Sequence, residues 1–492
     1  MARVAEDASG EMSRRYTLVA WIALAAVLAS VGWRVVEANR LTETPPGVQA
    51  TSGCEEESLY SLWRVRHGQA LYVESSEPPF AAAYFNWLFY FSYSRWQVVT
   101  ASPGDEPAAV RAARYLSVAG VALGIAALVG LTALACNSRQ RWSRPDLWAV
   151  ATYAFAGPMV GWWMVTARPD VWAFACETIG IVIVLVGHRR HAIFVAVVAG
   201  LAFYAAWAFK QNYVQGLAVC GLFLASHRRW GCAAGLFATM GGGCVLTLVL
   251  MDDAYLRGVS ETIGSGSFSV HYAWANLQNA VLKLIPVLLL PIFAGWRQDP
   301  TPAGDLWADV RQFSLIGLPC SLALSFAFSA KVGAASNYYF TTALMLSLLA
   351  ISLQACSSGR PLQYATLIGI AALSIGATAQ GARYLRQQAT VTSERWTLWR
   401  DAPVPRYSED QLLNLPWLQP GAPTYLTAFE YAADRKRGRL FRDDGIGGLI
   451  RSQYFASLLL PADVTTAFDG ASLHQYKRVQ EKAGMALWLR NF

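Results

Sequence analysis

Charged and amide side chains stand at breaks between apolar segments, and their types suit acid–base chemistry on an anionic substrate. Carboxylates occur at Glu55–Glu57 and at Asp170, and a carboxylate can be the general base that deprotonates a hydroxyl. Nearby Lys and Arg side chains can stabilise a phosphate leaving group. We therefore predict catalytic roles for Glu55, Glu56, Glu57 and Asp170, and substrate-binding roles for Arg168, Lys210, Gln211, Lys331 and Asn337.

The composition predicts that these residues belong to an integral membrane protein. Of the 492 residues, 54% are hydrophobic and 15% are charged, against about 25% charged in soluble proteins. This excludes disordered, fibrous and disulfide-scaffold proteins. The net charge of +8 comes from short basic clusters between apolar runs, which is typical of membrane orientation and not of nucleic-acid binding. The eight cysteines contain no CxxC pair.

About eleven apolar segments are near the length of about 20 residues that a membrane span needs. We predict an all-α polytopic bundle in residues 1–380, with an outer loop at 38–114, and a small external mixed α/β domain in residues 381–492. The aromatic stretch Pro79–Trp96 is expected to lie at the interface without crossing. The predicted spans are Tyr16–Val36, Tyr115–Cys136, Leu147–Thr166, Val171–Val186, Ala192–Phe209, Tyr213–Ser226, Cys232–Met251, Val281–Trp296, Phe313–Ala330, Tyr338–Cys356 and Leu362–Gln380.

The basic residues predict the orientation of these spans. Arg14 and Arg15 place the N-terminus in the cytoplasm by the positive-inside rule. Alternation then leaves the candidate site residues and the C-terminal domain outside. The same alternation puts the dense Arg clusters on the cytoplasmic side: Arg139, Arg141, Arg144, Arg189, Arg190, Arg228 and Arg229.

Each candidate motif also has a simpler explanation. Glu55–Glu57 could be a solvated loop, and Lys210 and Lys331 could extend to the interface as lysines at span ends commonly do. Arg168 and Asp170 could form a local ion pair at a break caused by Pro169. His271 has no partner at metal-ligand spacing. A transporter or flippase of a lipid-linked anion is therefore an alternative function, as is a protein that binds lipid without catalysis.

Several motifs occur in the order found in bacterial GT-C glycosyltransferases of the lipopolysaccharide and aminoarabinose-transferase type, which the chain resembles over about residues 15–350. The first outer loop of that family has an acidic residue, then Gly-x-x-Leu-Tyr and a Pro-rich aromatic segment. The matching segments here are Glu55–Glu57, Gly68–Tyr72, Glu77–Phe80 and Tyr84–Tyr90, followed by Ala167–Asp170, Phe209–Asn212 and Lys331–Tyr338.

The resemblance implies an inverting transferase of the bacterial inner membrane that uses a polyprenyl-phosphate-linked sugar. The acceptor would be a hydroxyl of a glycan, lipid or protein. The base would be one of Glu55–Glu57, with Glu56 placed first and Glu55 second, while Arg168 and Lys210 would hold the lipid phosphate. Tyr72 in the Leu-Tyr motif becomes a further substrate-binding candidate. Some members of the superfamily use a divalent metal such as Mg²⁺ or Mn²⁺, and others use none.

Overall fold

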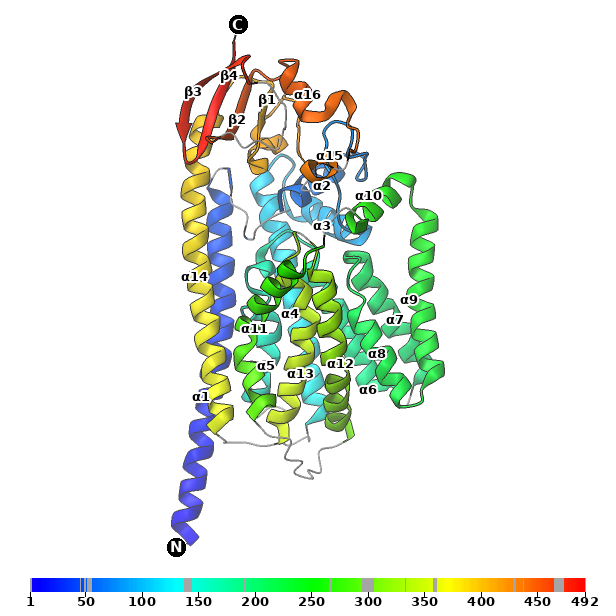
Figure 1. Ribbon diagram of the computed structural model, residues 1–492. Helices are drawn as coiled ribbons and strands as arrows, with labels where there is room; N and C mark the ends of the chain where they lie inside the picture. Colours follow the sequence, from blue (N-terminus) through cyan, green and yellow to red (C-terminus); the bar gives the residue numbers. More distant parts are fainter. Residues whose placement is uncertain are drawn as a thin grey trace.

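The computed structural model shows a helical bundle with a small domain at one end (Figure 1). We call the end that carries the C-terminal domain the domain end, and the other the far end. The N-terminus lies at the far end (Figure 1). The structure describes residues 2–44, 46–47, 50, 55–136, 144–189, 191–264, 268–293, 305–331, 333–356, 361–427, 431–436, 438–463 and 473–491.

Within these residues, nine helices are long and apolar enough to cross a membrane. Each coincides with one of the predicted spans, so the prediction of a polytopic helical membrane protein is confirmed. Prolines inside two of them are tolerated because neighbouring helices can satisfy the freed backbone groups. The nine are α1 (Ala2–Glu43), α4 (Glu106–Ala135), α6 (Asp170–Gly187), α7 (Ala192–Phe209), α9 (Trp230–Leu250), α11 (Val270–Phe293), α12 (Asp305–Ser329), α13 (Phe340–Cys356) and α14 (Pro361–Trp399).

The two remaining predicted spans coincide with shorter helices. Helix α5 (Pro145–Ala156) ends before Gly157, and the chain continues through the 3-10 turn η1 (Gly161–Val165). Helix α8 (Gln215–Ser226) starts only after an irregular stretch at 210–214. Non-helical backbone inside a membrane bundle is tolerated where protein buries it or where it lines a cavity. These two irregular stretches carry Arg168 and Lys210.

Three further helices lie at the domain end: α2 (Glu55–Arg66), α3 (Trp87–Thr100) and α10 (Asp253–Gly264) (Figure 1). Helix α3 contains most of the aromatic stretch that we expected not to cross. Its 14 residues reach about 21 Å, short of the hydrocarbon core of about 30 Å. The expectation is therefore consistent with its length.

The C-terminal domain is a four-stranded sheet with short helices, as predicted. The strand order is β1-β2-β4-β3, with β1 parallel to β2 and the other two pairs antiparallel. Helix α14 runs unbroken through position 380 into this domain. The remaining elements are β1 (Arg406–Ser408), β2 (Ser457–Pro461), β3 (Tyr476–Lys482), β4 (Met485–Arg490), α15 (Tyr431–Lys436), α16 (Gly445–Arg451), and the 3-10 turns η2 (Ser336–Tyr339), η3 (Gln411–Asn414), η4 (Pro416–Leu418) and η5 (Arg442–Asp444).

The domain is held to the bundle by the outer loop after α2. The Phe80 side chain is buried in the domain's own hydrophobic core, against Tyr431. The backbone N–H of Leu426 donates to the carbonyl of Pro79 at 2.8 Å. Arg439 pairs with Glu74 at 3.2 Å. The outer loop is therefore one of the contacts that position the C-terminal domain at this end, together with α2, whose Tyr60 packs against Leu412.

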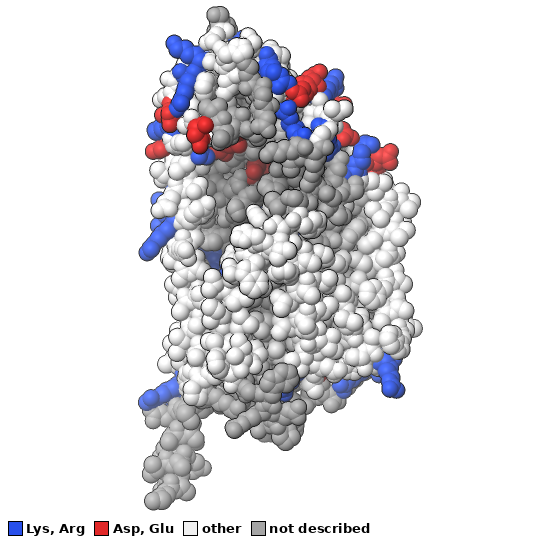
Figure 2. All heavy atoms as spheres, in the orientation of Figure 1, with Lys and Arg blue, Asp and Glu red and all other residues white. Residues whose placement is uncertain are grey.

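Charged side chains gather at both ends of the bundle, and a largely uncharged band separates them on the face in Figure 2. At the far end the charged side chains visible there are Lys and Arg (Figure 2). Arg144 and Arg189 occupy that end, at the start of α5 and after α6. Arg139, Arg141 and Arg190 lie outside the described residues.

We expect Phe80→Ala to weaken the attachment of the C-terminal domain. Phe80 is 1% exposed, and truncating a buried Phe costs about 3–5 kcal/mol. The purified variant should unfold at a lower temperature and lose residues 381–492 faster in limited proteolysis. Leu440→Ala is the control, because Leu440 is in the same domain but 90% exposed. Equal protease resistance of both variants would contradict this role for Phe80.

Candidate functional site

Three of the predicted motifs meet at the buried carboxylate of Asp170. Its Oδ1 accepts hydrogen bonds from Lys210 Nζ at 2.5 Å and from Asn337 Nδ2 at 2.6 Å. Its Oδ2 lies 3.4 Å from Nε of Arg168. All four side chains are at most 10% exposed. Residues that are up to 169 positions apart in sequence therefore form one ion cluster, which we call the Asp170 cluster.

The helix ends explain why this pairing forms here. Asp170 is the first residue of α6, after Pro169 at its N-cap, and Lys210 is the C-cap residue of α7. The helix dipole favours an anion at a helix N-terminus and a cation at a C-terminus. Antiparallel packing of α6 against α7 places these two ends side by side, so the ion pair satisfies both dipoles.

Aromatic rings surround the two cations. The guanidinium of Arg168 lies 4.4 Å from the ring centre of Trp163, and Lys210 Nζ lies 5.6 Å from that of Tyr338. Both cations also lie over Phe85, at 5.5 and 5.6 Å. Such contacts stabilise a cation and keep its direction fixed. Tyr72 positions Phe85, because its hydroxyl donates to the Phe85 carbonyl at 2.9 Å.

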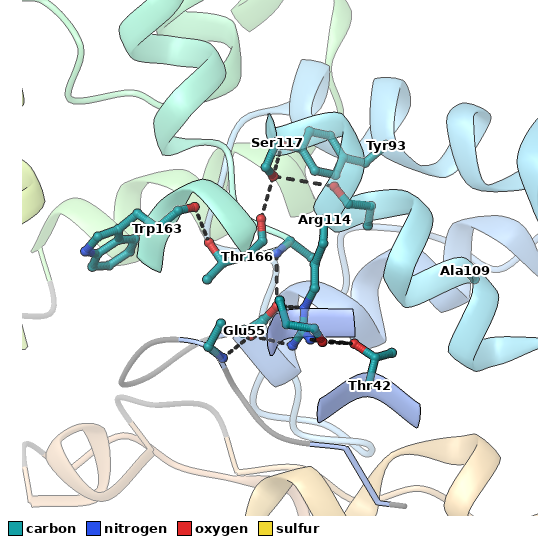
Figure 3. Close-up of polar contacts among 12 residues, drawn as sticks. Thr42, Glu55, Tyr93, Ala109, Arg114, Ser117, Trp163 and Thr166 are labelled. Atoms are coloured by element: carbon teal, nitrogen blue, oxygen red, sulfur yellow. Dashed lines mark hydrogen bonds and ion pairs between the residues drawn. The ribbon is translucent and has the colours of Figure 1, made fainter. Parts of the chain in front are cut away.

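Glu55 is fully engaged in a second ion pair (Figure 3). Its two oxygens accept from Arg114 Nε at 3.1 Å and Nη2 at 3.2 Å. They also accept from the backbone N–H groups of Ala167 and Ala50, both at 3.0 Å. Arg114 in turn donates to Thr42 Oγ1 at 2.7 Å. Glu55 therefore joins α1, α2, α4 and the segment before Arg168.

A small hydrogen-bond network next to this pair fixes the segment that carries Arg168 (Figure 3). Ser117 Oγ on α4 donates to the Thr166 carbonyl at 2.5 Å. The Tyr93 hydroxyl on α3 lies 2.7 Å from Ser117 Oγ and donates to the Arg168 carbonyl at 3.1 Å. The irregular backbone at 166–168 is thus held by both α3 and α4.

Glu56 has a different environment from Glu55. It is part-buried, and burial, together with the neighbouring carboxylates Glu55 and Asp410, raises its pKa to about 7, while Arg168 acts in the opposite direction. Glu56 is therefore within electrostatic range of Arg168 and of the C-terminal domain. A carboxyl with a pKa near 7 exchanges protons readily at neutral pH. Glu57 is buried on the same helix.

The other two predicted substrate-binding residues contact the backbone of neighbouring segments. Gln211 Nε2 donates to the Tyr84 carbonyl at 2.9 Å. Lys331 follows the end of α12, where its backbone pairs with Phe268 in an isolated bridge. Of the motif that begins at Lys331, Asn337 is the residue that bonds Asp170.

Three residues of this region were missed by the sequence reasoning. Arg114 lies in the long apolar helix α4, and a cation in such a helix is a signal that could have been used. Lys283 in α11 donates to Ser336 Oγ at 3.1 Å, next to Asn337. Asp410 approaches Glu56 only through tertiary packing of the distant C-terminal domain, so nothing local in the sequence indicates it.

Glu55 and Asp170 are each bonded to a basic side chain, so these two carboxylates do not offer the free oxygens that Mg²⁺ or Mn²⁺ prefers. Among the described residues, three His, Cys, Asp or Glu donors come within 4.8 Å of one another at one place, His188, His227 and Asp309. That group lies at the far end of the bundle.

The buried ion pair of Glu55 and the exposed ion pair of Glu43 predict different effects on stability when each glutamate is replaced. Glu55→Gln breaks the buried pair with Arg114, and loss of one partner of a buried pair costs about 3–5 kcal/mol. We expect a clearly lower unfolding temperature for Glu55→Gln and for Arg114→Met. The matched control is Glu43→Gln, which removes the more exposed contact with Arg111 at 3.8 Å and should change stability by about 1 kcal/mol or less. Equal stability of Glu55→Gln and Glu43→Gln would contradict the structural role.

Comparison with known proteins identifies the fold. No protein-family model and no curated protein sequence matches the chain. Among solved structures, ArnT from Cupriavidus metallidurans bound to undecaprenyl phosphate is similar with a TM-score of 0.60 and 12% identity, over 94% of this chain and 97% of that one. Its apo state gives a TM-score of 0.57 and 13% identity over the same shares.

A second match is the oligosaccharyltransferase of Archaeoglobus fulgidus in a complex with Zn and sulfate. Its TM-score is 0.56 at 11% identity, over 95% of this chain and 73% of that one. At these low sequence identities, the structural similarity establishes the fold alone. The chain therefore has the GT-C fold that the resemblance of its ordered motifs over about residues 15–350 implied.

Proposed function

We propose that the protein is a membrane glycosyltransferase that moves a sugar from a polyprenyl-phosphate-linked donor to an acceptor hydroxyl. The likeness over nearly the whole chain to ArnT, whose solved structure holds undecaprenyl phosphate, supports a lipid-phosphate donor. The fold alone does not determine chemistry, so the proposal rests mainly on the site. The acceptor would be a glycan, lipid or protein.

The observation that carries the proposal is a carboxyl group with a pKa near 7 beside a pair of buried cations. Glu56 is close enough to Arg168 for their charges to interact, and Arg168 and Lys210 share Asp170. Under this proposal a proton acceptor and a phosphate-binding pair would belong to one site. These are the two functions that transfer from a phosphate-linked sugar requires.

The reaction follows from this arrangement. The acceptor oxygen attacks the anomeric carbon while its proton passes to the Glu56 carboxylate. The bond between that carbon and the phosphate oxygen breaks, and the electron pair remains on the lipid phosphate. Arg168 and Lys210 offset the charge that develops there. Attack opposite the leaving phosphate inverts the configuration of the carbon.

Asp170 and Glu55 act as positioning residues in this account. Asp170 is held by Lys210, Asn337 and Arg168 and sets the direction of the two cations. Glu55 holds the segment that leads to Arg168 through the Ala167 N–H. Among the three glutamates of this loop, the pKa of Glu56, raised to about 7, makes it our choice for the group that exchanges a proton with substrate.

Polar atoms around Lys210 suit the sugar. Gln211 Oε1, Asn212 Oδ1, Tyr213 Oη and Asn337 Oδ1 are buried and have no hydrogen-bond partner among the described residues. Buried polar atoms in native proteins nearly always have a hydrogen-bond partner, so these four oxygen atoms suggest that a ligand supplies one. Sugar hydroxyls are donors that would satisfy these oxygens while the adjoining phosphate binds the cations.

The domain end would face the exterior or periplasm of a bacterial inner membrane. Arg144, Arg189, Arg228 and Arg229 lie near the far end, and an excess of Arg marks the cytoplasmic side. The N-terminus would then be cytoplasmic and the C-terminal domain external. A lipid-linked donor with its tail in the outer leaflet would present its phosphate at the depth of the Asp170 cluster.

Glu56→Gln should lower the turnover number about 10²–10⁴-fold, which is the usual contribution of a general base. The KM for the donor and the unfolding temperature should change little. Wild-type turnover should fall as the pH drops below about 7, because the base becomes protonated. Transfer of radiolabelled sugar in proteoliposomes measures both effects, with Glu43→Gln as the control. A fully active Glu56→Gln variant would exclude this base.

Lys210→Met should weaken donor binding about 10–100-fold, since a hydrogen bond to a charged group contributes about 1.5–3 kcal/mol and 1.4 kcal/mol corresponds to tenfold. Arg168→Met should have a similar effect. Arg111→Met, on α4 and outside the cluster, is the control. Unchanged binding of undecaprenyl phosphate in a folded Lys210→Met variant would refute the phosphate role.

The same proteoliposomes separate transfer from lipid-linked transport. Formation of a glycosylated acceptor supports the transferase. Movement of the labelled donor between leaflets without product would instead support a flippase.

A further inference from the structure

Three side chains of the types that bind metal ions lie close together at the far end of the bundle, away from the Asp170 cluster. His188 caps the C-terminus of α6, His227 caps that of α8, and Asp309 lies in the first turns of α12. One donor atom from each comes within 4.8 Å of the other two. Three separate helices therefore contribute one ligand-type side chain each to one point.

Hydrogen bonds to the backbone fix which ring nitrogen of each histidine faces this point. His188 Nδ1 lies 3.1 Å from the carbonyl of Val184 and 3.3 Å from that of Leu185. His227 Nδ1 lies 3.0 Å from the Phe223 carbonyl. A carbonyl only accepts, so each Nδ1 carries the proton, and the neutral rings present the lone pair of Nε2. Metal-binding histidines are commonly held in this way.

The remaining contacts leave room for an ion between the three side chains. His188 Nε2 lies 3.8 Å from Asp309 Oδ2, and His227 Nε2 lies 3.8 Å from Asp309 Oδ1, too far for direct hydrogen bonds. A tetrahedral Zn²⁺ with bonds of about 2.0–2.1 Å would separate its donors by roughly 3.4 Å. With one Asp309 oxygen as ligand, the three donor atoms lie within 4.8 Å of one another, so binding such an ion would draw them together by up to roughly 1.4 Å.

Two further observations favour a cation at this point. His188 is 1% exposed, and its Nε2 has no hydrogen-bond partner among the described residues. Two nitrogen lone pairs and a carboxylate that face one another repel unless a positive charge lies between them. Arg189 Nη2 already donates to Asp309 Oδ1 at 2.6 Å, which orients the carboxylate as an outer partner of a ligand does.

We propose that His188, His227 and Asp309 bind a divalent transition-metal ion through the two Nε2 atoms and a carboxylate oxygen, and that Zn²⁺ is the preferred ion. The donor set of two imidazoles and a carboxylate suits Zn²⁺ and similar ions better than Mg²⁺ or Ca²⁺. A water molecule would complete the tetrahedron. The site is separate from the proposed transferase site, and no step of that reaction uses it.

Its position gives the site a structural role. It joins α6, α8 and α12 at the far end. At the domain end, α6 begins with Asp170, α8 follows Lys210, and α12 leads to Lys331. The ion would therefore hold together the helices whose opposite ends carry the candidate phosphate-binding residues.

The test is metal stoichiometry of the full-length protein in detergent, purified through a tag without histidine. After incubation with Zn²⁺ and desalting, mass spectrometry should find about one Zn²⁺ per chain in the wild type. His188→Ala and His227→Ala should each weaken Zn²⁺ binding by more than the 10–100-fold that loss of an outer partner costs. His191→Ala, an exposed histidine at the same end, should bind as the wild type does.

Stability and spectra supply a second readout. Because a ligand that binds the folded state stabilises it, Zn²⁺ should raise the unfolding temperature of the wild type and of His191→Ala but not of His227→Ala. His227 is partly exposed, so this variant should fold even if His188→Ala does not. Co²⁺ should give the visible bands of a tetrahedral site. Absence of bound metal in the wild type, or equal Zn²⁺ binding by wild type and His227→Ala, would overturn the proposal.

Discussion

The ion cluster around Asp170 is the interaction on which the arrangement of the site depends. A buried carboxylate is costly unless it is paired and hydrogen-bonded, and here its partners are Arg168, two residues before it, and side chains from two other segments of the chain. Lys210 ends α7, Arg168 follows the break after α5, and Asn337 lies in η2 before α13. The cost of leaving these polar groups unpaired fixes the relative positions of three segments. The irregular stretches after α5 and before α8 are stabilised by the same contacts.

The outer loop connects this cluster to the C-terminal domain. Glu55 holds the loop to α1 and α4 through Arg114, while Phe80 holds the domain to the loop. Glu56 follows Glu55 on α2, and its charge interacts with those of Arg168 and Asp410. Burial is the largest cause of the rise in the pKa of Glu56, and the carboxylates of Glu55 and Asp410 add to it. The domain thus contributes to the electrostatics of the site as well as covering it.

Much of this arrangement could be predicted from the sequence. Apolar runs marked the helices, and the charges at their ends marked the residues that meet at Asp170, because side chains at the ends of antiparallel spans share one depth. The roles of Glu55, Glu56 and Glu57 could not be separated, since three successive glutamates differ only in what tertiary packing places beside them. Asp410 and the pairing of Glu55 with Arg114 are contacts between distant segments. His188 and His227 lie 39 positions apart and have no motif, so their meeting with Asp309 follows from helix packing alone.

In the proposed mechanism, the proton acceptor and the phosphate-binding cations form one site at the domain end. An experimental structure of the protein with bound undecaprenyl phosphate tests this most directly. The account predicts the phosphate within hydrogen-bond distance of Lys210 or Arg168, with Glu56 facing the side from which an acceptor would approach. A phosphate bound at the far end, or on the lipid-facing surface away from these cations, would contradict it.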